Sequence, residues 1–154
     1  MLIINTSGGG SRSAAFTMNV LQKLDAQCSG KLMDRTFLIT GASGGMFGAA
    51  YFRALARLKE TDPSINLQDH KYTDAISEDL LNPLFSSFVA RDLASPAQKF
   101  KVGHYEYIKD RGYAFEQKLN INTCGVLDRQ LKDIEPDEKM ARIPLMLLSS
   151  VVTR

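Results

Sequence analysis

The chain lacks several features that would assign it to a class of protein at once. Its 154 residues contain no tryptophan, only two cysteines and two histidines, and the formal net charge is only +2. Cys28 and Cys124 are too few for a disulfide scaffold and have no spacing typical of a metal site, so we expect both to be reduced and buried. The small net charge gives no electrostatic reason to expect nucleic acid as a partner.

Long apolar runs and a leader sequence are missing as well. No stretch approaches the roughly 20 apolar residues that cross a bilayer. No basic segment precedes the apolar residues at the N-terminus, so we predict no signal peptide. These absences favour a cytoplasmic or membrane-associated location. Hydrophobic residues make up 44% of the chain and charged residues 23%, which is typical of a globular protein and predicts one domain over 1–154.

Two strand–turn–helix units are predicted in the N-terminal part of the chain. A short apolar strand at 2–4 precedes a glycine-rich turn and a helical pattern. A second strand at 36–40 precedes a turn at 41–45 and a helix at 46–59. This order is typical of an α/β fold with a parallel sheet. Both turns follow the carboxyl ends of strands, where open α/β sheets carry their chemistry.

The remainder of the chain is less regular. The features predicted are N-caps at Ser11 or Ser13, a helix over 72–90 broken at Asn82-Pro83, loops at Ser95-Pro96 and Gly103, short helices over 114–119 and 127–134, and a buried strand over 143–152. A domain rarely ends inside its sheet. Because the last predicted strand runs almost into Arg154, we expect the chain to be a fragment.

The second turn carries a nucleophile motif. Gly41-Ala42-Ser43-Gly44-Gly45 fits G-x-S-x-G between a predicted strand and a predicted helix, which is the context that this motif requires. A sharp turn forces its central residue into a strained conformation, and flanking Cβ atoms would collide with neighbouring chain. The following helix directs its positive N-terminal dipole at the serine. The alternative interpretation is a glycine-rich turn whose serine only caps a helix.

The first turn is rich in glycine. In Ser7-Gly8-Gly9-Gly10-Ser11-Arg12, three consecutive glycines leave backbone N–H groups unobstructed, and such groups bind an oxyanion. Arg12 fixes the loop or adds positive charge. The alternatives are a phosphate-binding or merely flexible loop; a Walker loop is excluded because no Gly-Lys-Ser/Thr follows. In adjacent parallel strands the two turns would face one pocket.

Together these two segments resemble the patatin-like phospholipase family. The family's glycine-rich loop falls on residues 8–12 and its nucleophile elbow on 41–45. The resemblance implies a three-layer α/β/α fold with a mainly parallel central sheet. It implies hydrolysis of lipid acyl esters by a Ser–Asp dyad without histidine, metal or cofactor, with a lipid or phospholipid as partner and peripheral contact with a membrane. The implied site residues are Ser43 as nucleophile, Gly41 and Gly45 in the elbow, and Gly8, Gly9, Gly10, Arg12 and Gly44 in the oxyanion hole.

The chain departs from the family in one important respect. The family's catalytic aspartate lies in an Asp-Gly dipeptide, and none of the eleven aspartates here precedes glycine. We therefore expect that aspartate to lie beyond Arg154, and the chain as given to be inactive or nearly so, since serine is a weak nucleophile without a base. Ser13 stands where the family often has glycine. The segment Asp110-Arg111-Gly112 with Glu116 is similar to a segment of bacterial members.

Three other functions compete with the hydrolase. Residues 38–48 are similar to the nucleotide-binding turn of short-chain dehydrogenases, and Tyr105 and Lys109 have that family's Y-x-x-x-K spacing. Phe47, however, stands where the last glycine belongs, which spoils the approach to a pyrophosphate. A Ser–His–Asp hydrolase would use His70 or His104. The third alternative is a patatin-like lipid-binding module without catalytic activity.

Two further segments each have a purely structural and a functional interpretation. The apolar segment 80–93 either packs in the core or lines an acyl-chain channel. The second segment is either a solvated loop or a contact for lipid head groups. Its basic residues, which alternate with Tyr105 and Tyr107, are Lys99, Lys101, His104, Lys109 and Arg111.

Overall fold

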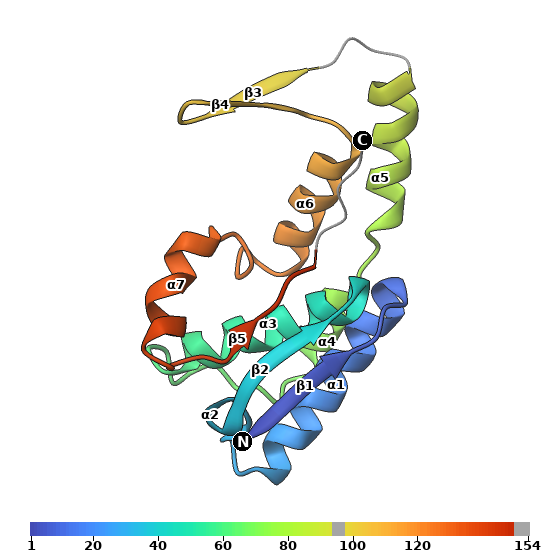
Figure 1. The fold of residues 1–154 in the computed structure, drawn as a ribbon. Coiled ribbons are helices and arrows are strands. Elements are labelled where there is room, and N and C mark those ends of the chain that lie inside the picture. The colour runs from blue at the N-terminus through green and yellow to red at the C-terminus, as the bar shows by residue number, and fades with distance from the viewer. Residues whose placement is uncertain (94–97, 150–154) are drawn as a thin grey trace.

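The computed structural model describes residues 1–93 and 98–149 (Figure 1). The elements are β1 (Leu2–Thr6), α1 (Gly10–Gln27), α2 (Leu32–Arg35), β2 (Thr36–Gly41), α3 (Ser43–Lys59), α4 (Lys71–Ser77), α5 (Leu81–Ser87), η1 (Phe88–Leu93), β3 (Lys99–Val102), β4 (Tyr105–Ile108), α6 (Arg111–Asn122), α7 (Leu131–Lys139) and β5 (Leu145–Met146). The predicted loop at Ser95-Pro96 and the end of the predicted strand over 143–152 lie outside the described residues.

A parallel sheet of three strands organises the fold, in the order β1-β2-β5. Thr6 at the end of β1 is in register with Gly41 at the end of β2, so the turns after both strands leave the same edge. The prediction of an α/β fold with a parallel sheet is confirmed. The pairing also confirms that the two glycine-rich turns are neighbours.

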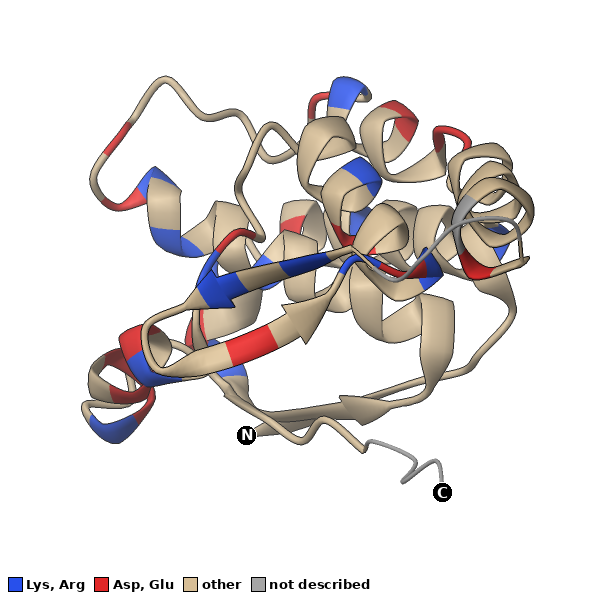
Figure 2. Ribbon diagram, turned by 90° about the horizontal axis from the view of Figure 1, so that it is seen from above, with Lys and Arg blue, Asp and Glu red and all other residues tan. Residues whose placement is uncertain are grey.

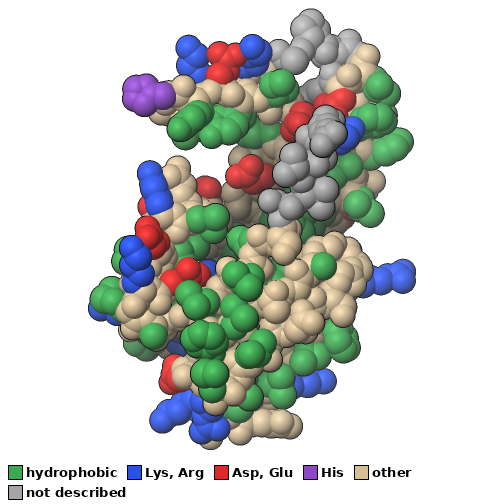
Figure 3. Space-filling model, in the orientation of Figure 1, with side chains coloured by type: hydrophobic (Ala, Val, Ile, Leu, Met, Phe, Trp, Pro, Cys, Tyr) green, Lys and Arg blue, Asp and Glu red, His purple; other side chains and the backbone are tan. Residues whose placement is uncertain are grey.

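The two faces of this sheet have different surroundings. Ile39 is fully buried, and its register partners Ile4 and Met146 pack against the core. On the opposite face Ile3 is 62% exposed and Leu145 is 41% exposed. The helices α1, α3 and α4 lie on the first face (Figure 2), and hydrophobic side chains gather on the open one (Figure 3). Among the described residues, then, no helix forms the second layer that an α/β/α fold requires.

The helices α1 and α3 cross with their backbones in close contact. A Cβ at Gly44 would overlap the carbonyl oxygen of Gly10, and one at Gly48 would overlap that of Ala14. Each helix has two small residues spaced four apart at the crossing, Gly10 and Ala14 on α1 and Gly44 and Gly48 on α3. Because no large side chain stands between the helices there, their backbones can touch. The core beneath this crossing contains Met18, Leu21, Phe52 and Leu55.

Ion pairs from α3 hold α7 and β5 in place. Arg53, only 6% exposed, donates from Nη1 to Glu138 Oε1 at 2.6 Å and to the carbonyl oxygen of Pro144 at 2.7 Å. A single buried guanidinium thus joins α3 to α7 and to the residue before β5. Charge-assisted hydrogen bonds of this kind are stronger than neutral ones. Loss of the Glu138 carboxylate would leave the buried charge of Arg53 without its counter-ion.

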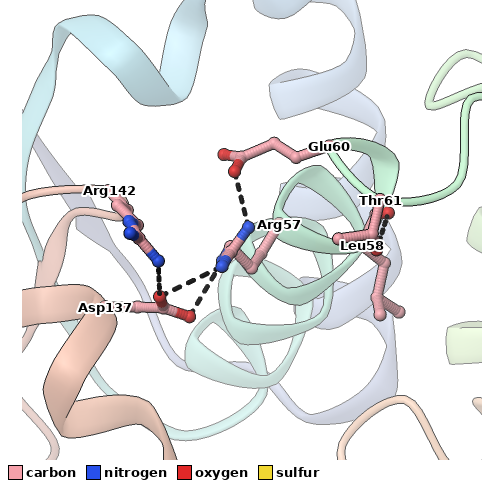
Figure 4. Close-up of polar contacts among 6 residues, drawn as sticks. All are labelled: Arg57, Leu58, Glu60, Thr61, Asp137 and Arg142. Atoms are coloured by element: carbon pink, nitrogen blue, oxygen red, sulfur yellow. Dashed lines mark hydrogen bonds and ion pairs between the residues drawn. The ribbon is translucent and has the colours of Figure 1, made fainter.

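One turn further along α3, Arg57 forms a second polar contact with α7 (Figure 4). Its Nε lies 2.8 Å from Asp137 Oδ2, and its Nη1 donates to Glu60, the C-cap residue of α3. Arg142 Nη1 approaches the same aspartate at 3.5 Å. The hydrogen bond from Arg57 lowers the pKa of Asp137, and the nearby positive charges lower it further. Acidification is therefore expected to weaken the attachment of α7 to α3.

Over its described part, 143–149, the predicted buried strand is wrong in both length and burial. Ile143 and Pro144 are buried, but β5 contains only Leu145 and Met146. Leu145, Leu147 and Leu148 are exposed. Burial of a strand needs cover on both faces, and in the described residues the helices supply it on one face only. The strand predicted at 2–4 is real and extends to Thr6, but Ile3 on the uncovered face is exposed, and so is Leu2 at the N-terminal end of the strand.

The helix predicted over 72–90 is interrupted earlier than expected. It divides into α4, which ends at Ser77, and α5, which begins at Leu81. Asn82 and Pro83, the predicted break, lie in the first turn of α5. Proline is accepted there because the first turn needs no backbone N–H for an intrahelical bond.

The boundaries of other helices also differ from the predicted ones. Helix α1 begins at Gly10 with Gly9 as N-cap, so Ser11 and Ser13 are helical and not caps. Helix α3 starts at Ser43 rather than 46, which leaves a turn of very few residues. Helix α6 is longer than the predicted 114–119 because Asp110 caps it, accepting a hydrogen bond from Tyr113 N–H at 3.0 Å.

Near the C-terminus the predicted helix over 127–134 is displaced to 131–139, where Gln130 and Asp133 form a capping box. The predicted loop at Gly103 is the turn of an antiparallel hairpin, β3–β4, that the sequence analysis missed. Both cysteines are free thiols, but Cys124 is exposed and Cys28 only partly buried, so the expected burial is wrong.

Candidate functional site

Ser43 lies on a sharp, strained turn. Its φ is 51°, in the left-handed region that a non-glycine residue rarely occupies. Gly41 has a φ of 150°, which favours glycine. The turn is fixed to the first strand by a hydrogen bond of 3.1 Å from Ala42 N–H to the carbonyl oxygen of Thr6. The strained elbow predicted at this position is therefore present.

The elbow glycines are required by close contact with the first strand–turn unit. A Cβ at Gly41 would overlap the backbone of Thr6, and one at Gly45 would overlap the carbonyl oxygen of Ser7. In both cases the obstacle is backbone, which cannot rotate aside. Glycine at these positions therefore lets the two turns touch.

The first turn wraps around the serine. A Cβ at Gly8 would lie 3.2 Å from Ser43 Cβ and 3.9 Å from its Oγ. Gly9 and Gly10 have φ values of 146° and 64°, which other residues adopt only with strain. The hydroxyl of Ser13 donates to the carbonyl oxygen of Ser7 at 2.5 Å, so the helix and the loop support each other.

The two turns share one pocket of about 330 Å³. Its lining residues are Gly9, Gly10, Ser11, Arg12, Ala14, Ser43, Gly44, Phe47, Ile76, Leu80, Leu81 and Phe115. Of the predicted site residues, Gly9, Gly10, Arg12, Ser43 and Gly44 are brought together here. Gly8 lies directly against Ser43, whereas Gly41 and Gly45 do not line the pocket and instead pack against Thr6 and Ser7.

Two helices begin at this pocket, α1 at Gly10 and α3 at Ser43. The first N–H groups of a helix have no acceptor within the helix, and the helix dipole adds positive potential there. Both effects favour an anion or a developing negative charge. The pocket therefore combines the exposed Ser43 with the N-terminal ends of two helices.

The rest of the pocket wall is apolar. The rings of Phe47 and Phe115 lie 5.5 Å apart between centroids, and Ile76, Leu80 and Leu81 complete the wall. Leu80 and Leu81 come from the apolar segment 80–93, whose start thus reaches the site. A hydrocarbon group fits such a wall far better than a charged one does.

Sequence reasoning missed Phe47 and Phe115 as pocket residues. Phe47 follows Ser43 by four positions on α3, so its helical spacing was a usable signal. Phe115 is far away in the sequence, and only the fold brings it here. Phe47 also lines a second, mainly apolar cavity of about 280 Å³ between α3, α6 and α7. Phe47 thus borders two apolar spaces.

No aspartate, glutamate or histidine lines this pocket within residues 1–93 and 98–149. Nor does that part of the chain hold a cluster of three or more side chains suited to a metal ion. None of its helices is long and apolar enough to cross a bilayer. A base for Ser43 is therefore not supplied by the described lining residues.

The residues that carried the competing functions lie elsewhere. His70 precedes α4 and His104 is in the β3–β4 turn; both are exposed and neither lines the pocket of Ser43. Tyr105 and Lys109 belong to the hairpin, which does not pair with the main sheet. Gly48 faces the backbone of Ala14. It packs helix on helix and is not open to a dinucleotide.

The basic residues around the hairpin are partly paired. Lys99 Nζ lies 2.6 Å from Glu106 Oε1, and Arg111 Nη1 lies 3.6 Å from Asp92 Oδ2. The Lys99–Glu106 pair and the side chain of Arg111 are exposed, as a solvated surface would have them. This arrangement favours the interpretation of that segment as a solvated surface rather than a contact for lipid head groups.

Comparison of the chain with protein-family models, with curated proteins and with solved structures gave no match in any of the three.

Proposed function

We propose that the chain carries the nucleophile half of a serine acyl hydrolase that cleaves lipid acyl esters. The observation that supports this best is the strained Ser43, at φ 51°, facing an apolar pocket together with Gly9 and Gly10. Strain of this size at a serine needs a reason, and exposure of a nucleophile is a common one. The family resemblance points in the same direction.

The proposed chemistry uses both turns. Ser43 Oγ attacks the ester carbonyl carbon and gives its proton to a base, while the carbonyl oxygen becomes an oxyanion. Backbone N–H groups of the glycine loop and of Gly44 bind that oxyanion, each contributing on the order of 3 kcal/mol. The C–O bond to the leaving alcohol then breaks and the alcohol takes up the proton. Water hydrolyses the acyl-serine to release the fatty acid and restore the hydroxyl.

We infer that the base is a carboxylate supplied from outside residues 1–154. No described lining residue offers one, and the family resemblance implies an aspartate in an Asp-Gly dipeptide that this chain does not contain. The uncovered apolar face around Ile3 and Leu145 also fits a three-layer domain whose second helical layer is supplied from outside the chain. Without the base, turnover is expected to be very slow.

Labelling with a fluorophosphonate tests the assignment, because this probe reacts with activated serine hydroxyls. In a chain extended beyond Arg154 that contains the base, we expect phosphonylation of the Ser43 peptide, located by mass spectrometry, and its loss in Ser43→Ala. The 154-residue chain should label far more slowly, because its serine is not activated. Ser11 provides the matched control because it lines the same pocket but has ordinary helical geometry.

Ser11→Ala should keep the label. Labelling that disappears in Ser11→Ala and persists in Ser43→Ala would overturn the proposal. So would an absence of labelling in both the 154-residue chain and the extended one. Tight binding of a nicotinamide dinucleotide would support the dehydrogenase alternative instead.

A further inference from the structure

The cavity between α3, α6 and α7 is large and mostly apolar. Its volume is about 280 Å³, and all of its lining residues except Arg53, Arg57, Arg129 and Asp137 are hydrophobic. Protein interiors are close-packed and leave few apolar spaces larger than a water molecule unfilled. A space of this size and lining is therefore a candidate for a bound apolar group.

The buried charges at this cavity already have partners within the chain. Arg53 lies 2.6 Å from a carboxylate oxygen of Glu138, and Arg57 lies 2.8 Å from one of Asp137. Arg129 is exposed to solvent. Because the buried guanidinium and carboxylate groups satisfy one another, a ligand in the cavity needs no charge of its own. The lining favours an uncharged hydrocarbon group.

The cavity begins next to the Ser43 pocket and follows α3 away from it. Phe47 lines both spaces, and its ring lies 5.5 Å from that of Phe115, which lines the Ser43 pocket. Along α3 the lining extends from Met46 to Arg57, which is about 16 Å along the helix axis. An elongated apolar space that starts beside the serine fits a long, narrow group better than a compact one.

We propose that this cavity holds the far end of a long acyl chain whose ester carbonyl lies at Ser43, with the chain passing beside the ring of Phe47. The inference rests on the proposed function, because the serine fixes the carbonyl end of the substrate. Each methylene buried in the cavity should raise affinity about fourfold. A butyryl group would end within the Ser43 pocket, so the cavity assigns long-chain esters as the preferred substrate class.

Photo-crosslinking tests where the chain end lies. The probe is methyl hexadecanoate with a diazirine on its last carbon, added to the 154-residue chain, and the attached peptides are located by mass spectrometry. We expect attachment within residues 119–134, which supply the α6 and α7 walls of the cavity. Unlabelled methyl hexadecanoate should compete. Methyl butyrate with the same diazirine should attach only to lining residues of the Ser43 pocket, such as Leu80 or Phe115.

A pair of leucine substitutions on α3 provides the matched comparison. Ala54 is partly buried and lines the cavity, whereas Ala56 is partly buried on the same helix and lines a different pocket. In Ala54→Leu the extra carbons occupy space that the chain end would fill. Displacement of two methylenes should raise the probe concentration at half-maximal crosslinking by about tenfold. Ala56→Leu should leave that concentration unchanged, and circular dichroism checks that both variants are folded.

Several results would overturn the inference. One is attachment of the long probe within residues 80–93, which would place the chain along α5 instead. Others are crosslinks that unlabelled ester does not displace, and an equal loss in the two leucine variants.

The inference and the proposed function fail separately. Ser43→Ala should still crosslink within residues 119–134, because it removes the nucleophile and not the cavity. Displaceable crosslinks there, with no fluorophosphonate label on Ser43 in the extended chain, would refute the hydrolase and leave a hydrocarbon-binding cavity. A label on Ser43 without crosslinks in the cavity would refute the assignment of the cavity alone.

Discussion

Replacing Gly48 with alanine should destabilise the protein, although helix propensity alone predicts the opposite. Gly48 is buried within α3, and alanine in a helix interior is favoured over glycine by about 1 kcal/mol. The structure, however, places the backbone of α1 where the new Cβ would stand. That atom would overlap the carbonyl oxygen of Ala14 and lie 3.1 Å from its carbonyl carbon.

The size of the stability loss in Gly48→Ala depends on which atoms must move to admit the new Cβ. Overpacking by one carbon costs about 1–3 kcal/mol in side-chain cores, and sometimes more. Here both opposing groups are backbone, so α1 and α3 must separate along their length, and we take the upper part of that range. After subtraction of the propensity gain the expected net loss is about 2 kcal/mol. For a chain of this size that lowers Tm by about 4–8 °C.

Urea unfolding of Gly48→Ala measures the loss, with a lower midpoint and an unchanged slope. The comparison variant is Gly112→Ala, because Gly112 is also helical but its Cβ would meet only the side chain of Asp110, at 3.1 Å from the Oδ1 that caps α6. The propensity gain of about 1 kcal/mol and the disturbance of that cap, also worth about 1 kcal/mol, should nearly cancel, so we expect a net change below about 1 kcal/mol. If Gly48→Ala proves as stable as the parent chain, the close crossing of α1 and α3 is wrong, and with it the shared pocket.

Three further outcomes are expected. Glu138→Ala should cost about 3 kcal/mol in denaturant unfolding because it leaves the buried Arg53 without its carboxylate partner, whereas Glu135→Ala, which removes an exposed i,i+4 pair, should leave the unfolding midpoint almost unchanged; equal losses would contradict the buried tether. The lowered pKa of Asp137 contributes stability that is present above its unfolded-state pKa of about 3.9 and is lost as pH falls through the lower folded-state value. The stability difference between the parent and Asp137→Asn should therefore be large at pH 7 and vanish in acid, and a difference independent of pH would refute the role of that ion pair. In the extended chain, Phe47→Ala should open the Ser43 pocket into the neighbouring cavity and raise the preference for dodecanoate over butyrate esters by about 10-fold, and an unchanged ratio would show that the acyl chain does not pass this ring.

The local part of the candidate site could be predicted from the sequence. The G-x-S-x-G segment and the glycines at 8–10 each follow an apolar strand, and parallel strands bring such turns to one edge. The steric demand of a sharp turn is also local, so the strain at Ser43 followed from the motif. Backbone geometry over a few residues is decided by those residues, which is why these predictions agree with the structure.

The fold decided everything that depends on distant neighbours. Phe115 reaches the pocket from α6, and no spacing in the sequence relates it to Ser43. The apolar segment after Met140 was predicted to be a buried strand, yet Leu145 and Leu147 are exposed, because burial depends on what covers a surface and not on how apolar it is. Leu81 and Phe85 of α5, both apolar and both exposed, show the same limit: hydrophobic periodicity marks which side chains avoid water, while only the tertiary packing determines which of them find cover.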